Sequence, residues 1–133
     1  MNVLILGSGG REHCFAELIS KSKHCDKLFV APGNSGTSLM AQNLDFSPID
    51  FDLVKGAITK HNIQLVVVGP EDPLVSGIHD FIVSDPVLKG VKVIGPKQQA
   101  AQLEGSKDFA KNFLNRHNIP TAKHQTFTTR QFE

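Results

Sequence analysis

Tryptophan and tyrosine are absent from this sequence, and neither sign of charge is in excess. The 133 residues include 14 Lys and Arg against 13 Asp and Glu, which gives a formal net charge of +1. A domain that binds duplex DNA normally concentrates basic residues on one face, and no run of five like charges occurs here. Only Phe and His remain to stack on bases. We therefore expect no binding to nucleic acid.

Long apolar segments are also lacking. The longest aliphatic run covers residues 65–68, whereas a helix that crosses a bilayer needs about 20 apolar residues. The first residues, MNVLILGSGGREH, have neither the basic segment nor the long apolar stretch of a secretory signal peptide. We expect neither a membrane-bound nor a secreted protein.

Cysteine is scarce, with Cys14 and Cys25 as its only two positions. If both lie on one helix, they are about 16 Å apart at 1.5 Å per residue. A disulfide requires Cα atoms less than about 7 Å apart. We expect two reduced thiols and a cytoplasmic protein.

What is present fits one globular α/β domain, with 40% hydrophobic and 20% charged residues. Short apolar runs that end at Gly or Pro predict strands, and the continuous run at residues 3–6 predicts a strand buried on both faces. These strands are expected at residues 3–6, 28–31, 65–68 and 91–94. The expected helices follow residue 10, run from the cap Asp50 to about residue 61, follow the cap Asp72, and cover residues 98–103 and 106–117. Residues 34–48 are interpreted as a loop.

Strands that alternate with helices predict parallel βαβ units with right-handed crossovers. The expected fold is a small doubly wound, mostly parallel sheet of the Rossmann-like kind. In such sheets ligands bind beside the carboxyl ends of the strands. The helix after the first strand is expected to use Phe15, Leu18 and Ile19 as its apolar side.

The segment GSGGREH after the first strand is the strongest local signal. Glycines let backbone amides approach an anion, and the start of the next helix adds partial positive charge. A tight turn without a ligand is the alternative. The dinucleotide pattern requires glycine where Glu12 stands, and the second strand ends in Ala31-Pro32-Gly33 rather than near an acidic residue. A dinucleotide-binding oxidoreductase domain is therefore disfavoured.

A second candidate is the turn that contains Glu71 and Asp72. If Asp72 caps the next helix, Glu71 points into the crevice, where it can hold a hydroxyl or an amine; a solvated turn residue is the alternative. Glu12 is interpreted as a first-turn residue that suits the helix dipole. No spacing typical of a metal site occurs among the histidines and cysteines.

The C-terminal segment predicts a strand beginning at residues 123–127 and a helix cap at residues 128–131, which have the form Thr-x-x-Gln. A capped helix with no room to continue indicates the front part of a longer protein. We expect further domains downstream.

Four motifs in order resemble the N-terminal domain of the phosphoribosylamine–glycine ligase family. They are VLILGSGGREH, FVAPGNSGT at residues 29–37, VVVGPEDPLVSGI at residues 66–78, and VIGP followed by AAQLEGSKDFAKNFLNRHNIPTA. The resemblance implies an ATP-dependent carbon–nitrogen ligase of de novo purine biosynthesis, with Mg²⁺ on the nucleotide. Such a ligase joins glycine to 5-phosphoribosylamine through an acyl phosphate and yields glycinamide ribonucleotide.

The same resemblance implies roles for particular residues. Residues 1–104 would form the substrate-binding domain, and residues 105–133 would begin an ATP-grasp region. The 5-phosphate would lie at Gly7, Ser8, Gly9, Gly10 and Arg11. Asn34 and Glu71 would bind sugar hydroxyls or the amine, and Lys107 would contact ATP. Neither a catalytic residue nor a metal ligand is implied.

Two small departures, Ser8 for an expected Asn and Cys14 for an expected Ala, leave this site intact. Without the downstream domains, the 133-residue chain is expected to be inactive, with no tightly bound cofactor. A stand-alone module that binds a phosphorylated metabolite is the alternative function.

Overall fold

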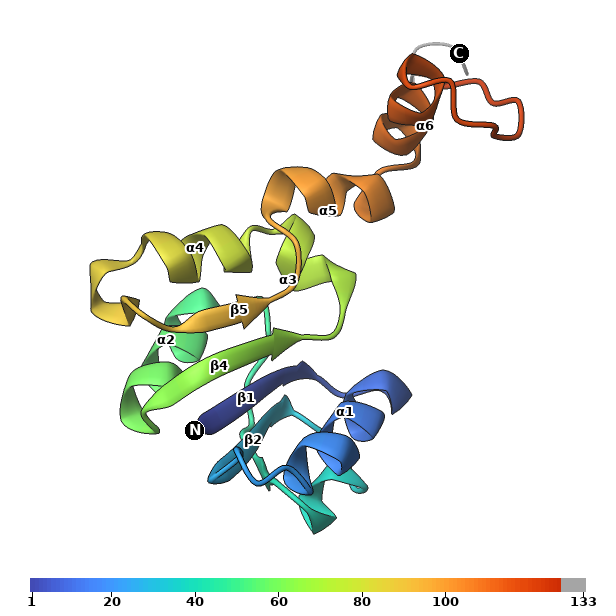
Figure 1. The fold of residues 1–133 in the computed structure, drawn as a ribbon. Coiled ribbons are helices and arrows are strands. Elements are labelled where there is room, and N and C mark those ends of the chain that lie inside the picture. Colours follow the sequence, from blue (N-terminus) through green and yellow to red (C-terminus); the bar gives the residue numbers. More distant parts are fainter. Residues whose placement is uncertain (128–133) are drawn as a thin grey trace.

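The computed structural model describes residues 1–127 of the chain. Their central element is a parallel sheet of five strands in the order β3-β2-β1-β4-β5 (Figure 1). The strands are β1 (Asn2–Gly7), β2 (Lys27–Pro32), β3 (Gln42–Asn43), β4 (Ile63–Val68) and β5 (Lys92–Ile94). The predicted small doubly wound α/β fold is confirmed.

Helices connect the strands and cover both faces of the sheet (Figure 1). They are α1 (Gly10–Ser20), α2 (Phe51–Lys60), α3 (Glu71–Val75), α4 (Ile78–Ser84), α5 (Gln98–Gly105) and α6 (Lys107–Arg116), with short 3-10 turns η1 (Thr37–Leu39) and η2 (Pro86–Leu88). The helix α2 begins as expected, because the Asp50 carboxylate accepts a hydrogen bond from the Leu53 amide at 3.1 Å.

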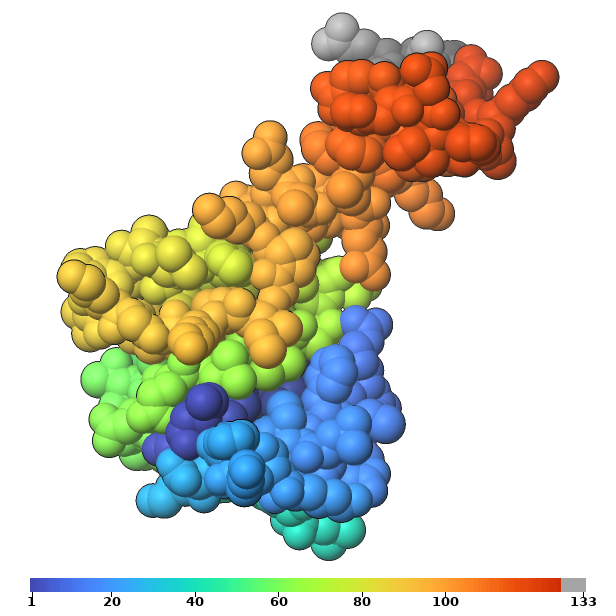
Figure 2. All heavy atoms as spheres, viewed as in Figure 1, coloured from blue at the N-terminus to red at the C-terminus, as the bar shows by residue number. Residues whose placement is uncertain are grey.

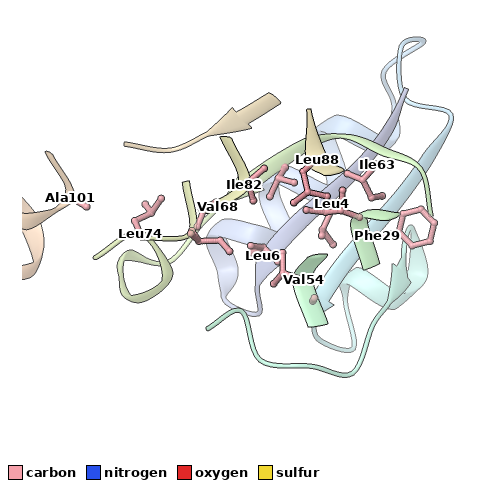
Figure 3. Close-up of a cluster of buried hydrophobic side chains, with 14 residues drawn as sticks. Leu4, Leu6, Phe29, Val54, Ile63, Val68, Leu74, Ile82, Leu88 and Ala101 are labelled. Atoms are coloured by element: carbon pink, nitrogen blue, oxygen red, sulfur yellow. The ribbon is translucent and has the colours of Figure 1, made fainter. Parts of the chain in front are cut away.

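Side chains of β1 alternate between two buried clusters, as the two-residue period of a strand requires. Leu4 and Leu6 pack in the larger cluster, which includes residues of α2 and α4 (Figure 3). Val3 and Ile5 pack on the other face, against Ala16 of α1. Burial on both faces explains why the strand reads as a continuous apolar run.

Two elements differ from the sequence-based expectation. The strand β3 lies inside the segment interpreted as a loop, and its two polar residues pair with Phe29 and Val30 of β2. The single helix expected after Asp72 is divided at Gly77, whose φ of 98° is left-handed and ends α3 before α4 begins.

The surroundings of α1 also correct two expectations. Leu18 was expected on the apolar side but is 69% exposed, whereas Ala16 is fully buried. Ala16 packs directly against the sheet, and Phe15 and Ile19 are partly buried beside it, as expected. The helix ends at Ser20, so Cys25 lies in the connection to β2 rather than on the same helix as Cys14. Both thiols are free, as expected, and burial raises the pKa of the Cys25 thiol.

The C-terminal elements project away from the sheet (Figures 1 and 2). No residue of α6 is buried. The strand expected at residues 123–127 is wrong, since these residues form neither helix nor strand; a strand needs a neighbouring edge, and the sheet lies at the other end of α5. The helix cap expected at residues 128–131 lies outside the described residues.

Candidate functional site

A cavity of about 420 Å³ lies beside the carboxyl ends of the strands. The chain runs from β1 to β2 on one side and continues to β4 on the other, so the ends of β1 and β4 form the topological switch point where such sheets bind ligands. The lining residues come from four segments of the chain: Gly7, Ser8, Gly9 and Glu12; Pro32; Ser47, Pro48 and Ile49; and Pro70, Asp72 and Pro73.

The Gly-rich loop forms one wall of this cavity. Gly7 ends β1 with a φ of 127°, a conformation that glycine adopts without strain. Gly9 is the N-cap of α1, and its amide donates to Oε2 of Glu12 at 2.6 Å. The chain thus supplies its own anion to the Gly9 amide. The amides that follow have no partner within the helix, because the first amides of an α-helix never do.

Arg11 joins this loop to the next strand end. Its Nη1 donates to the carbonyl oxygen of Gly69, directly after β4, at 2.5 Å. The residue is otherwise exposed, and a guanidinium carries five N–H donors in all. Arg11 therefore links the ends of β1 and β4 and has further N–H donors besides the one that Gly69 uses.

Asn34 lies beside the Gly-rich loop, where its Nδ2 donates to the carbonyl oxygen of Ser8 at 2.8 Å. Its Oδ1 accepts from the amides of Gly36 and Thr37 at 2.8 and 3.0 Å. These bonds shape the loop after β2. The second N–H of Nδ2 has no partner among residues 1–127.

Of the predicted site residues, Gly7, Ser8 and Gly9 line the cavity, whereas Gly10, Arg11, Asn34, Glu71 and Lys107 do not. The N-cap of α3 is Pro70, so the expectation that Asp72 caps this helix is wrong, because the helix begins two residues earlier than that cap requires. Asp72, rather than Glu71, is among the lining residues of the cavity. Lys107 is the first residue of α6, which projects away from the sheet (Figure 1), and it is not among the lining residues of the cavity.

Comparison of the sequence with models of protein families identifies the family of this chain. The model of the phosphoribosylglycinamide synthetase N domain matches residues 1–104. The chain belongs to this family. Phosphoribosylamine–glycine ligase of Haemophilus influenzae is 51% identical over 131 residues, which are 96% of this chain and 29% of the relative. The corresponding ligase of Rhodopirellula baltica is 48% identical over 126 residues, which are 95% of this chain and 28% of the relative.

Among solved structures, the crystal structure of phosphoribosylamine–glycine ligase from Thermotoga maritima is similar with a TM-score of 0.64 and 30% sequence identity. The similarity covers 92% of this chain and 26% of that chain. The chain therefore spans less than a third of the length of these relatives. The family membership inferred from the four motifs is confirmed.

The position of one residue of this synthetase N domain, Glu12, was not predicted from the sequence. Glu12 was interpreted as a first-turn residue that suits the helix dipole, yet it is only 5% exposed and lines the cavity. The signal that could have found it is the glycine at positions 7, 9 and 69, which leaves room for one long side chain between two strand ends.

Metal and membrane features are absent from the part of the chain that the structure describes. Within residues 1–127, no group of three or more His, Cys, Asp and Glu side chains is arranged to hold a metal ion. Within the same range, no helix combines the length and apolar character needed to cross a membrane.

Proposed function

We propose that this chain is the N-terminal part of an ATP-dependent ligase that joins glycine to 5-phosphoribosylamine in purine biosynthesis in the cytoplasm, and that its own share is to hold the phosphoribosyl substrate. The observation that carries the proposal is the cavity at the switch point, bounded by the Gly-rich loop. The names of the relatives supply the reaction.

The substrate phosphate would lie at the start of α1. Partner-free amides of the first helical turn and the positive end of the helix dipole favour an anion there. Arg11 would add a charge-assisted bond from the donors that Gly69 does not use. The sugar would extend toward Asn34 on one side and toward Glu71 and Asp72 on the other.

Downstream domains would complete the reaction. ATP would supply the energy of amide-bond formation, with Mg²⁺ neutralising its phosphates, and Lys107 would contact the nucleotide. No metal cluster is found among residues 1–127, so we assign this chain no step that involves the metal.

The test compares Arg11→Ala with Lys21→Ala, a cation removed from the other end of α1, where Lys21 pairs only with Glu17. Loss of a bond to a charged group costs about 1.5–3 kcal/mol, or about tenfold or more in affinity. In the complete ligase, Arg11→Ala should raise the KM for phosphoribosylamine by that factor, with little effect on the KM for ATP or glycine. A raised KM for ATP with an unchanged KM for phosphoribosylamine would refute this placement.

A further inference from the structure

A buried carboxylate faces the cavity without being used by the proposal above. Glu12 and Thr37 are the two buried polar or charged side chains of residues 1–127. The Thr37 hydroxyl has hydrogen-bond partners in the Asn34 carbonyl oxygen and in Oδ1 of Asn43 of β3. Glu12 instead extends from α1 to the ends of β1 and β4, where it lines the cavity.

Three glycines surround this carboxylate. A Cβ atom added to Gly7 would lie 2.7 Å from Cγ and Cδ of Glu12, and one added to Gly9 would lie 3.0 Å from Oε2. A Cβ atom at Gly69 would collide with Oε1. The Glu12 side chain therefore fills a space that exists only because these three positions lack side chains.

The two carboxylate oxygens differ in their partners. Oε2 accepts the hydrogen bond from the Gly9 amide. Oε1 accepts none within residues 1–127, and yet no fully buried side-chain oxygen or nitrogen of the described chain lacks a partner. Oε1 is therefore reached from the cavity, although the residue as a whole is 5% exposed.

A carboxylate oxygen that is largely removed from water and lacks a donor is costly, because its lost hydration is not replaced. A ligand that brings an O–H or N–H donor would replace it. A simple anion would instead meet a like charge at short range, which is unfavourable. One oxygen can therefore favour one class of ligand and disfavour another.

We propose that Glu12 is a specificity-determining residue whose Oε1 accepts a hydrogen bond from a hydroxyl or amine of the sugar, so that the cavity selects a phosphorylated sugar over inorganic phosphate. This inference rests on the proposed binding of a phosphoribosyl substrate. It assigns to Glu12 a contact beyond its structural bond to Gly9.

The test uses the 133-residue chain and its Glu12→Gln variant. Glutamine keeps the shape, and its carbonyl can still accept from the Gly9 amide, but it presents an NH₂ donor where Oε1 was. Glu17→Gln is the matched control, because it removes the same charge from an exposed position of the same helix. Calorimetric titration compares ribose 5-phosphate, glycinamide ribonucleotide and inorganic phosphate, with thermal unfolding as the check on folding.

We expect wild type to bind ribose 5-phosphate more tightly than inorganic phosphate. Glu12→Gln should weaken ribose 5-phosphate about tenfold without weakening inorganic phosphate, and Glu17→Gln should change neither. If only glycinamide ribonucleotide is weakened, the donor is the N–H rather than a hydroxyl, and the proposal stands.

Four results would overturn the proposal. If both sugar phosphates bind Glu12→Gln as tightly as wild type, the proposed hydrogen bond to Oε1 is refuted, whereas the proposed function is unaffected. Equal weakening of all three ligands means that Glu12 acts only by shaping the loop. Wild type that binds neither sugar phosphate refutes the proposed function and this inference together. The wild-type preference is informative even if the variant does not fold, since selection by Oε1 is contradicted when neither sugar phosphate binds more tightly than inorganic phosphate.

Discussion

Replacing Gly69 by alanine tests how the switch point is packed. The added methyl group would collide with Oε1 of Glu12 and would lie 2.6 Å from Cδ and 2.8 Å from Cγ. Gly69 is buried, and the Arg11 side chain holds its carbonyl oxygen. Because the strand end cannot retreat freely, Glu12 must move, and its hydrogen bond from the Gly9 amide is then lost.

The cost follows from these contacts. Forcing a methyl group into a packed site costs about 1–3 kcal/mol, and losing a hydrogen bond to a charged group costs about 1.5–3 kcal/mol. Alanine has a lower conformational entropy than glycine in the unfolded state, which raises the free energy of unfolding by about 0.4–1 kcal/mol. We expect Gly69→Ala to lower the free energy of unfolding by about 3 kcal/mol, which lowers Tm by roughly 10 °C for a domain of this size.

Chemical denaturation and calorimetry measure this change. Gly56→Ala is the control, because Gly56 is exposed within α2, with no atom within 4 Å of an added Cβ; it should stabilise the chain by about 0.5–1 kcal/mol. The double variant Glu12→Ala/Gly69→Ala should be more stable than the sum of the single effects predicts, since removing Glu12 makes room for the methyl group. A loss below about 0.5 kcal/mol for Gly69→Ala, or strict additivity, would refute the packing argument.

Three further outcomes are expected. Asp50→Ala should cost about 1 kcal/mol in the free energy of unfolding, because the Leu53 amide loses its cap, whereas Asp50→Asn should be nearly neutral. The hydrogen bond from Lys55 lowers the pKa of the Asp85 carboxyl; the stability from this pair is present above the unfolded-state pKa and is lost as pH falls through the lowered one, so Lys55→Met should destabilise near neutral pH and converge with wild type in acid denaturation curves. Calorimetry should detect no micromolar binding of NAD, since the second strand ends without an acidic residue that could hold the ribose hydroxyls.

Strands buried on both faces could be predicted from the sequence. Such a strand needs apolar residues at successive positions, and this continuous apolar run ends at Gly or Pro. The strand β3 could not, since Gln42 and Asn43 carry no apolar signal and pair only because β2 offers an open edge. The division between α3 and α4 at Gly77 could not be predicted from the sequence either. Leu74, Ile78 and Ile82 keep a helical spacing across it, so only the backbone shows that two helices share the pattern.

The location of the candidate site could be predicted from the sequence, whereas the contacts of its side chains could not. Parallel topology brings the Gly-rich loop and the end of β4 to one edge, and the cavity lies there. The contacts depend on side-chain direction, which no spacing in the sequence reveals. An acidic residue in the first turn of α1 suits the helix dipole whether its side chain points to solvent or into the cavity. The three glycines that face Glu12 leave the space in which its side chain lies.

Side chains around the Gly-rich loop connect segments that are distant in the sequence, since Arg11 reaches Gly69 and Asn34 reaches Ser8. Such bonds hold the loop before a ligand arrives, which lowers the ordering cost of binding. A truncation at either position therefore removes a ligand contact and also loosens the loop. Loosening should weaken every ligand that binds at this loop and lower Tm, whereas a lost contact should weaken only ligands that make it. Shape-preserving substitutions such as Glu12→Gln are consequently the variants that report on ligand chemistry itself.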